Sequence, residues 1–155
     1  MSTCPFHRLL RKLKVFAGLP VPVTAKWVDD KPDFRQTDVD QMVRCVRFGL
    51  CGVCGGKLGF HAFWIGGPLC QQNRFFADAA MHRECAEESM RLCPFLNGKR
   101  QAYRGDLPHV ETQEASGRPA RMFLMRGMTS AMGWRDVRGT TLIYAGDALL
   151  TVRDF

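Results

Sequence analysis

Two short pairs of metal-ligand residues constrain the fold of this chain more than any other feature of its sequence. Cys51 and Cys54 are separated by two residues in the run Cys-Gly-Val-Cys-Gly-Gly, and His82 and Cys85 repeat this spacing after a gap of 27 residues. Glycine tolerates positive φ, so the first run can wrap both sulfurs toward one point. Together the pairs supply four soft ligands, the number that a closed tetrahedral zinc site requires. The sequence therefore predicts a structural zinc ion (Zn2+) bound by these four residues.

The second pair falls at the start of a predicted helix. Residues 81–93 read MHRECAEESMRLC, and Pro94 follows directly after Cys93. The glutamates fall in the first half of this segment, where the helix dipole favours negative charge. Positions i and i+3 are neighbours on a helix surface, so His82 and Cys85 can bind the same ion. A Cys-x2-Cys turn, a β segment and a helix with two ligands in its first turn together resemble a treble-clef zinc finger. This resemblance covers residues 51–93 and implies a knuckle, a β-hairpin and a helix.

Three further residues compete for the ion. Cys93 lies eight residues after Cys85, and on a continuous helix that spacing is ~12 Å of rise. Two sulfurs that each lie ~2.3 Å from one zinc ion cannot be so far apart, so Cys93 is expected to join only if the helix ends early. Spacing excludes neither Cys70 nor His61. Either could replace a member of the set or contribute to a second metal site.

A zinc-dependent hydrolase or nuclease competes with a structural role for the ion. His61, Asn73 and His82 stand in the order of a His-Asn-His nuclease, but no Asp-His pair ends the strand of the expected hairpin. Four protein ligands leave no coordination position for water, which favours a structural site over a catalytic one. Hydrolysis is therefore a second alternative function, and no residue is assigned a catalytic role.

Length and composition indicate one domain over residues 1–155. Apolar residues make up 46% of the chain and charged residues 24%, both ordinary for a soluble globular protein. No run approaches the ~18 apolar residues of a membrane span, and the basic N-terminus lacks the apolar core of a secretory signal. We therefore expect a cytoplasmic protein without a membrane partner. In that reducing compartment seven cysteines indicate metal binding more than disulfides, and ordinary buried thiols are the plain alternative.

The net charge of +7 raises the alternative of nucleic-acid binding. Residues 1–50 carry nine Lys/Arg against five Asp/Glu, and residues 99–155 carry nine against six, whereas residues 51–98 carry four of each. If the protein binds a polyanion, residues 1–50 and 99–155 are expected to make the contacts. The alternative is that these basic residues form an ordinary solvated surface. The basic residues that would contact phosphate are Arg8, Arg11, Lys12, Lys14, Lys99, Arg100 and Arg104.

Hydrophobic periodicity predicts helices on the N-terminal side of the metal-ligand region. A basic amphipathic helix is expected at residues 1–17, followed by extended chain at 21–27. A second helix is expected to begin at Thr37, as its cap, and to end at Gly49. Cys45 lies off the apolar stripe of this helix, so we expect an ordinary thiol there.

The rest of the chain is predicted to form a zinc-binding core and a β-rich end. The core spans residues 51–96, with a strand at 58–65 and a connecting loop at 69–80. Residues 105–120 are polar and carry prolines, which indicates a loop or linker. Residues 121–155 are expected to form an antiparallel β segment, with strands at 122–125, 140–144 and 149–152.

Four motifs in order resemble a family of uncharacterised phage and bacterial proteins. They are Cys-x2-Cys-Gly, Gly-Pro-x-Cys-x-x-Asn, His-x-x-Cys-Ala and Cys-Pro-Phe-Leu, and they lie within residues 18–96. The matching positions are Cys51, Cys54, Cys70, His82, Cys85 and Cys93. The resemblance implies a phage or prophage origin, and hence the host cytoplasm, but it implies no activity. We expect a non-enzymatic zinc-stabilised protein that binds another macromolecule, with a host or defence protein as the natural target of a phage factor.

Overall fold

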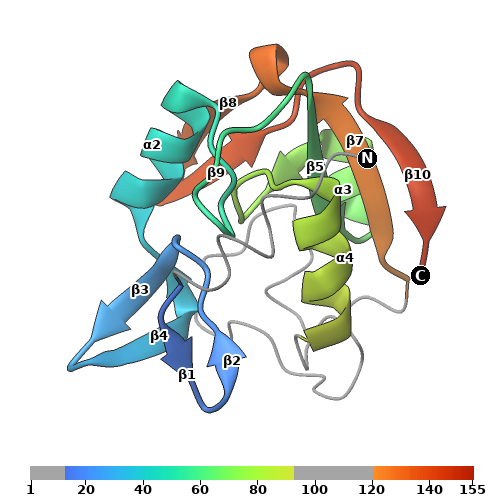
Figure 1. The fold of residues 1–155 in the computed structure, drawn as a ribbon. Helices are drawn as coiled ribbons and strands as arrows, with labels where there is room; N and C mark the ends of the chain where they lie inside the picture. The colour runs from blue at the N-terminus through green and yellow to red at the C-terminus, as the bar shows by residue number, and fades with distance from the viewer. Residues whose placement is uncertain (1–12, 93–120) are drawn as a thin grey trace.

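The computed structural model describes residues 13–92 and 121–155, which form a mixed α/β fold of short helices and antiparallel sheets (Figure 1). The expected mixture of helices and antiparallel strands is therefore confirmed. No helix in the described ranges has both the length and the apolar character that a membrane crossing demands. The described helices are α2 (Val39–Phe48), α3 (Pro68–Asn73) and α4 (Arg83–Leu92), with a 3-10 turn η2 (Thr129–Ala131).

A three-stranded antiparallel sheet joins the middle of the chain to its C-terminal part. Its strands, in spatial order, are β10 (Leu150–Asp154), β7 (Phe123–Met128) and β5 (His61–Gly66). β5 and β7 pair without a register shift along their whole length. Burial alternates along β5, so that Ala62 and Trp64 face the core while the residues between them are half-buried.

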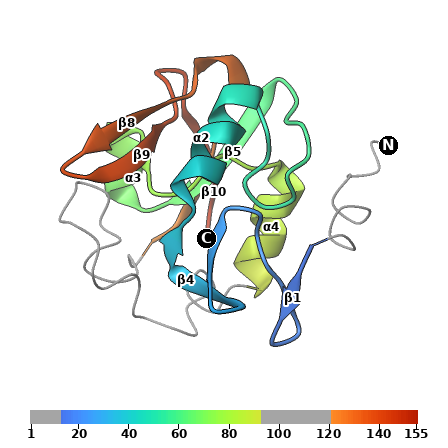
Figure 2. The same ribbon diagram turned by 90° about the vertical axis from the view of Figure 1, so that its left-hand side faces the viewer.

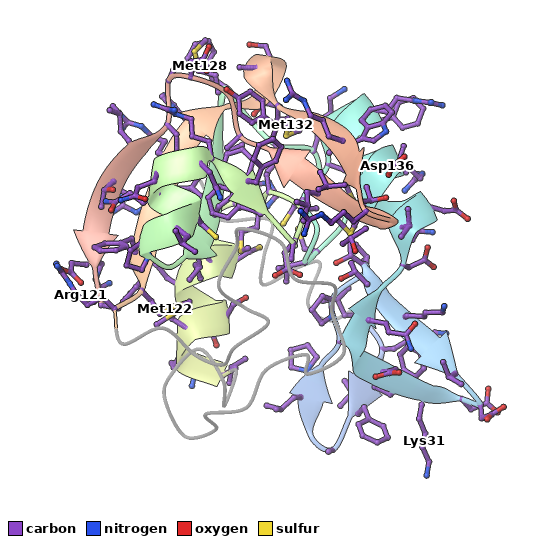
Figure 3. All side chains as sticks on the ribbon, turned by 180° about the vertical axis from the view of Figure 1, so that it is seen from behind. Lys31, Arg121, Met122, Met128, Met132 and Asp136 are labelled. Carbon is purple, nitrogen blue, oxygen red and sulfur yellow. The ribbon has the colours of Figure 1, made fainter. Side chains whose placement is uncertain are left out.

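A second three-stranded sheet contains a hairpin that the sequence did not reveal. Its strands, in spatial order, are β6 (Phe75–Phe76), β9 (Thr140–Tyr144) and β8 (Gly133–Val137). β8 and β9 are joined by Arg138 and Gly139, both with positive φ, which is the backbone of a tight type I′ hairpin turn. Figure 2 shows this hairpin beside α2, which contacts β8. In Figure 3, Met132 lies directly before β8 and Asp136 lies one residue before its end.

Two small hairpins lie together, away from these sheets (Figure 1). They are β1 (Val15–Phe16) with β2 (Leu19–Pro20), and β3 (Ala25–Val28) with β4 (Lys31–Thr37). Asp29 and Asp30 have φ of 50° and 62° at the tip of the second hairpin, where Lys31 projects from the molecule (Figure 3). The helix expected at 1–17 is wrong at its end, because Ala17 takes a positive φ and turns the chain back into β2. Residues 1–12 lie outside the described part of the chain.

Helix α2 begins one residue later than predicted, and its buried face includes one position outside the predicted stripe. The Asp38 carboxylate accepts a hydrogen bond from the N–H of Gln41, so Asp38 rather than Thr37 caps the helix. Gly49 ends α2 in the left-handed conformation, as expected. Cys45 is 1% exposed and joins Met42 on the buried face, whereas the stripe predicted from periodicity places it outside.

The core lies between the two sheets and the helices. Trp64 of β5 stacks on Phe76 of β6 with 5.5 Å between ring centroids, and Met42, Leu124 and Ile143 complete the apolar cluster. Phe76 belongs to the stretch 69–80, which was predicted as a loop but forms most of α3 and all of β6. The expected C-terminal strands are present. Residues 145–147, which the sequence predicts as a turn between the last two strands, instead connect strands of different sheets.

Candidate metal centre

Cys51, Cys54, His82 and Cys85 come together in the structure. Their ligand atoms all lie within 4.8 Å of one another. The Nδ1 atom of His82 is 3.4 Å from the sulfur of Cys54 and 3.7 Å from the sulfur of Cys85. The three cysteines are buried and His82 is half-buried. One nitrogen and three sulfur donors therefore converge on one point, and this Cys/His cluster could hold a metal ion.

The first pair sits on a tight backbone turn, the knuckle (residues 51–56), which presents both sulfurs on one side. The N–H of Cys51 donates to the carbonyl of Gly56, and the N–H of Gly55 donates to the carbonyl of Cys51. Gly55 has a φ of 75°, which glycine adopts without steric cost. Two amides donate to the sulfurs at 3.4 Å, from Val53 to Cys51 and from Gly56 to Cys54. Amide donors stabilise negative charge, so the knuckle favours thiolates.

Gly52 holds the knuckle against the segment that precedes α4. Its N–H donates to the carbonyl of Ala80 at 2.8 Å, and its carbonyl accepts from the hydroxyl of the buried Thr24 at 3.0 Å. A Cβ added at Gly52 would lie 2.9 Å from the Cβ of Ala79, closer than real Cβ contacts. This close approach brings the first pair within reach of His82.

The second pair is positioned by β5 and by the first turn of α4. Met81 and Phe63 exchange two backbone hydrogen bonds of 2.9 and 3.0 Å, which attach the chain to β5 directly before His82. The Nε2 atom of His82 lies 2.8 Å from the carbonyl oxygen of Lys57. Because a carbonyl only accepts, neutral His82 carries its proton on Nε2 and directs the Nδ1 lone pair at the cysteines. A metal-ligating histidine has this arrangement in most sites.

The protonation of the cluster follows from its mutual hydrogen bonds. Burial alone would raise the pKa of the Cys51 thiol, but hydrogen bonds from the neighbouring ligands outweigh burial and lower it. Hydrogen bonds with Cys51 and Cys54 raise the pKa of His82 to about 11. Hydrogen bonding to Cys51 also raises the pKa of Cys85, which stays a thiol at neutral pH. Without a metal, these opposite pKa shifts favour a thiolate at Cys51 next to a protonated His82.

Of the other predicted ligands that the structure describes, none belongs to this cluster. His61 lies in β5 opposite Met128, with its ring edge-on to Phe60 at 5.0 Å. Cys70 is fully buried in α3. In residues 13–92 and 121–155, no second group of three or more potential ligands lies close enough together to hold an ion. Cys93 lies outside the described residues.

The basic residues predicted to contact nucleic acid are mostly beyond the described part of the chain. Of the seven, the structure describes Lys14, whose ammonium lies 4.7 Å from the centroid of the Trp27 ring. The linker predicted at 105–120 also lies outside the described ranges.

Sequence reasoning missed the groups that support the cluster. The carbonyl of Lys57 and the hydroxyl of Thr24 act through single hydrogen bonds that no motif encodes. Cys45 was placed on the outside of its helix, yet its thiol lies 3.9 Å from the carbonyl oxygen of Cys51. Burial, followed by the nearby Cys51 charge, raises the pKa of Cys45 to about 11, so it is a neutral thiol beside the cluster.

The fold and the site define a small mixed α/β protein with a four-residue Cys/His cluster. Comparisons with protein-family models, with curated proteins and with solved structures found no match for this chain. The resemblance to phage and bacterial proteins therefore stays a prediction.

Proposed function

We propose that the Cys/His cluster binds a structural zinc ion and that the protein is a non-enzymatic binding protein stabilised by this ion. Zinc–sulfur bonds of ~2.3 Å and a zinc–nitrogen bond of ~2.0 Å at a tetrahedral angle separate the sulfur and nitrogen ligands by ~3.5 Å. The distances from His82 Nδ1 to Cys54 and Cys85 are 3.4 and 3.7 Å, which supports a tetrahedral ion. This agreement is the observation that carries the proposal.

The order of the ligands supports a variant of the treble-clef finger. The knuckle supplies the first pair, and the start of α4 supplies the second pair, as in that finger. In place of a simple hairpin, β5 makes one two-bond bridge with Met81, and α3 and β6 lie between the two. We propose that the motif is a treble clef whose hairpin has been opened by this insertion.

A structural ion suits this part of the chain because its backbone is irregular. The knuckle and the segment 77–82 contain little regular secondary structure, so few backbone hydrogen bonds hold them together. Structural zinc contributes an apparent ~10–16 kcal/mol in finger peptides, against ~5–15 kcal/mol for the stability of a typical domain. One ion could therefore determine whether the knuckle and α4 stay together.

The function that we propose follows from a closed site. Four protein ligands would fill the tetrahedral shell and leave no position for a reacting water, so the ion would stabilise a surface rather than perform chemistry. That surface would bind another macromolecule. The phage-type resemblance favours a host or defence protein as a first expectation, and nucleic acid is the alternative.

Elemental analysis of the purified, reduced protein tests the metal site, with two matched cysteine variants. Cys85→Ala removes a member of the cluster, and Cys45→Ala removes a buried helical thiol beside it. We expect one zinc per chain in the wild type and in Cys45→Ala, and loss of zinc in Cys85→Ala. Equal zinc in both variants, or none in the wild type, would contradict the proposal. A zinc-dependent hydrolytic activity that His61→Ala abolishes while zinc content is kept would favour the enzyme alternative.

A further inference from the structure

An arginine and two aromatic rings gather on one face of the β6–β9–β8 sheet. Phe75 and Tyr144 are cross-strand partners whose ring centroids lie 5.2 Å apart. The exposed guanidinium of Arg135 lies 5.6 Å from the Phe75 ring and 5.3 Å from the Tyr144 ring. The hydroxyl of Tyr144 donates to the carboxylate of Asp147, which fixes the orientation of the ring. We call Phe75, Tyr144 and Arg135 the aromatic platform.

The platform is open on its β8 side. Gly133 pairs with Tyr144 across the sheet, so the two positions share a face. A Cβ added at Gly133 would meet no heavy atom of the described residues within 4 Å. A planar group could therefore lie over Gly133, against the edge of Tyr144, without moving the backbone.

A second arginine stands beside the platform in an unusual backbone conformation. Arg74 has a φ of 64°, a left-handed conformation that costs energy for any residue with a Cβ. Its carbonyl accepts from the N–H of Ala145, next to Tyr144, which ties it to β9. The Nε atom of Arg74 is buried and has no hydrogen-bond partner among the described residues. A glycine would fit this backbone at lower cost, so the arginine side chain itself calls for an explanation.

We propose that the aromatic platform and Arg74 bind single-stranded nucleic acid. Bases stack on aromatic rings and on arginine guanidinium planes, and arginine contacts the phosphates. Here the Arg135 guanidinium, which lies over the two rings, offers a stacking plane, Gly133 leaves room for a base beside Tyr144, and Arg74 adds a positive charge next to β9. The inference rests on the proposed binding function and takes up its nucleic-acid alternative in place of a protein partner, and it uses residues outside the metal site.

The observations favour a single strand over a duplex or a protein. A duplex buries its bases in the stack, where side chains on the face of a sheet cannot stack on them. Protein interfaces are also enriched in aromatic residues and Arg, so the rings alone do not decide between the partners. The positive charge of Arg135 and Arg74 beside the rings favours a polyanion. The net charge of +7 adds a general attraction for polyanions.

Fluorescence anisotropy of the zinc-loaded full chain tests the proposal, with short labelled single strands of DNA and RNA and the matching duplex as probes. We expect single strands to bind more tightly than the duplex. Tyr144→Ala, and Gly133→Leu, which fills the open space, should each weaken single-strand binding about 5- to 150-fold, the measured range for one stacked base. Arg135→Lys keeps the charge but loses the plane, so it should also weaken binding.

Arg74→Gly separates binding from folding. It relieves the backbone conformation, so the protein should unfold at the same or a higher temperature while single-strand binding weakens. Binding should also depend less on salt. The slope of log affinity against log salt concentration should be shallower than in the wild type by ~0.7 for each phosphate that Arg74 neutralises. Melting at a lower temperature than the wild type would assign Arg74 a structural role and overturn its part in binding.

Arg153→Ala is the matched control. The guanidinium of Arg153 also lies over a ring, 4.8 Å from the centroid of Phe155, but Arg153 belongs to β10 of the other three-stranded sheet. It should bind single strands like the wild type. Equal binding by the platform variants and this control, tighter binding to the duplex, or no binding at low salt would overturn the proposal. Zinc content is measured for every variant, so failure of the metal site and failure of the platform are told apart.

Discussion

Replacing Gly52 with alanine tests the close contact between the knuckle and the segment before α4. The added Cβ would lie 2.9 Å from the Cβ of Ala79 and 3.4 and 3.5 Å from the carbonyl oxygens of Ala79 and Ala80. Only the contact with the Cβ of Ala79 is closer than an ordinary van der Waals contact, and a Cβ moves only with its backbone, so a side-chain rotation cannot relieve it. Overpacking of this kind costs ~1–3 kcal/mol.

Gly59→Ala is the control for the backbone effect of the substitution. No heavy atom of the described residues lies within 4 Å of the added Cβ at Gly59. Both variants restrict the unfolded chain and gain the same ~0.4–1 kcal/mol from that restriction. The difference between the variants therefore isolates the contact with Ala79 and Ala80, and we expect it to be ~1–3 kcal/mol.

The measurement is urea-induced unfolding of both variants at one fixed concentration of free zinc. The zinc concentration must be fixed because a ligand of the folded state adds to its apparent stability. A lower free energy of unfolding for Gly52→Ala is the expected result. If the two variants unfold at the same urea concentration with the same slope, the knuckle does not depend on this contact and our account of how the cluster is assembled is wrong.

Three further predictions concern the cluster and its surroundings. In the metal-free protein the pKa of His82 is about 11 and that of Cys85 is raised, so at least these two ligands must lose a proton when zinc binds. The apparent zinc affinity, measured by competition with a chelator, should therefore fall at least about 100-fold for each unit that pH drops below neutrality. His61→Ala and Cys70→Ala should each keep the zinc content of the wild type, and a loss would mean that one of them is a ligand. Gly49→Ala should lower the free energy of unfolding by ~1–2 kcal/mol, because Gly49 has a φ of 64°; an unchanged value would show that the end of α2 can adjust.

The candidate site was predictable from the sequence because ligand spacing is local. Two residues between Cys51 and Cys54, and two between His82 and Cys85, place each pair on one turn of backbone whatever the rest of the chain does. The same local signals predicted the end of α2 at Gly49 and the strand at 140–144.

The arrangement of the strands was not predictable, because it depends on contacts far apart in the sequence. β5 pairs with β7, some sixty residues later, and nothing in either segment specifies the other. α3 and β6 were missed because the stretch 69–80 has no clear period, and β6 is a strand only through its pairing with β9. The buried position of Cys45 was missed because its thiol lies against the carbonyl of Cys51, a contact that the helical period does not encode.

The pairing of β5 with β7 sets an order of events during synthesis of the chain. The knuckle and the first turn of α4 are complete before residues 121–155 leave the ribosome, so a metal ion can be captured while β5 still has a bare edge. A captured ion would fix His82, and the bridge between Met81 and Phe63 would in turn keep β5 extended. The C-terminal strands would then add to a prepared template, which shortens the search that makes long-range β pairing slow.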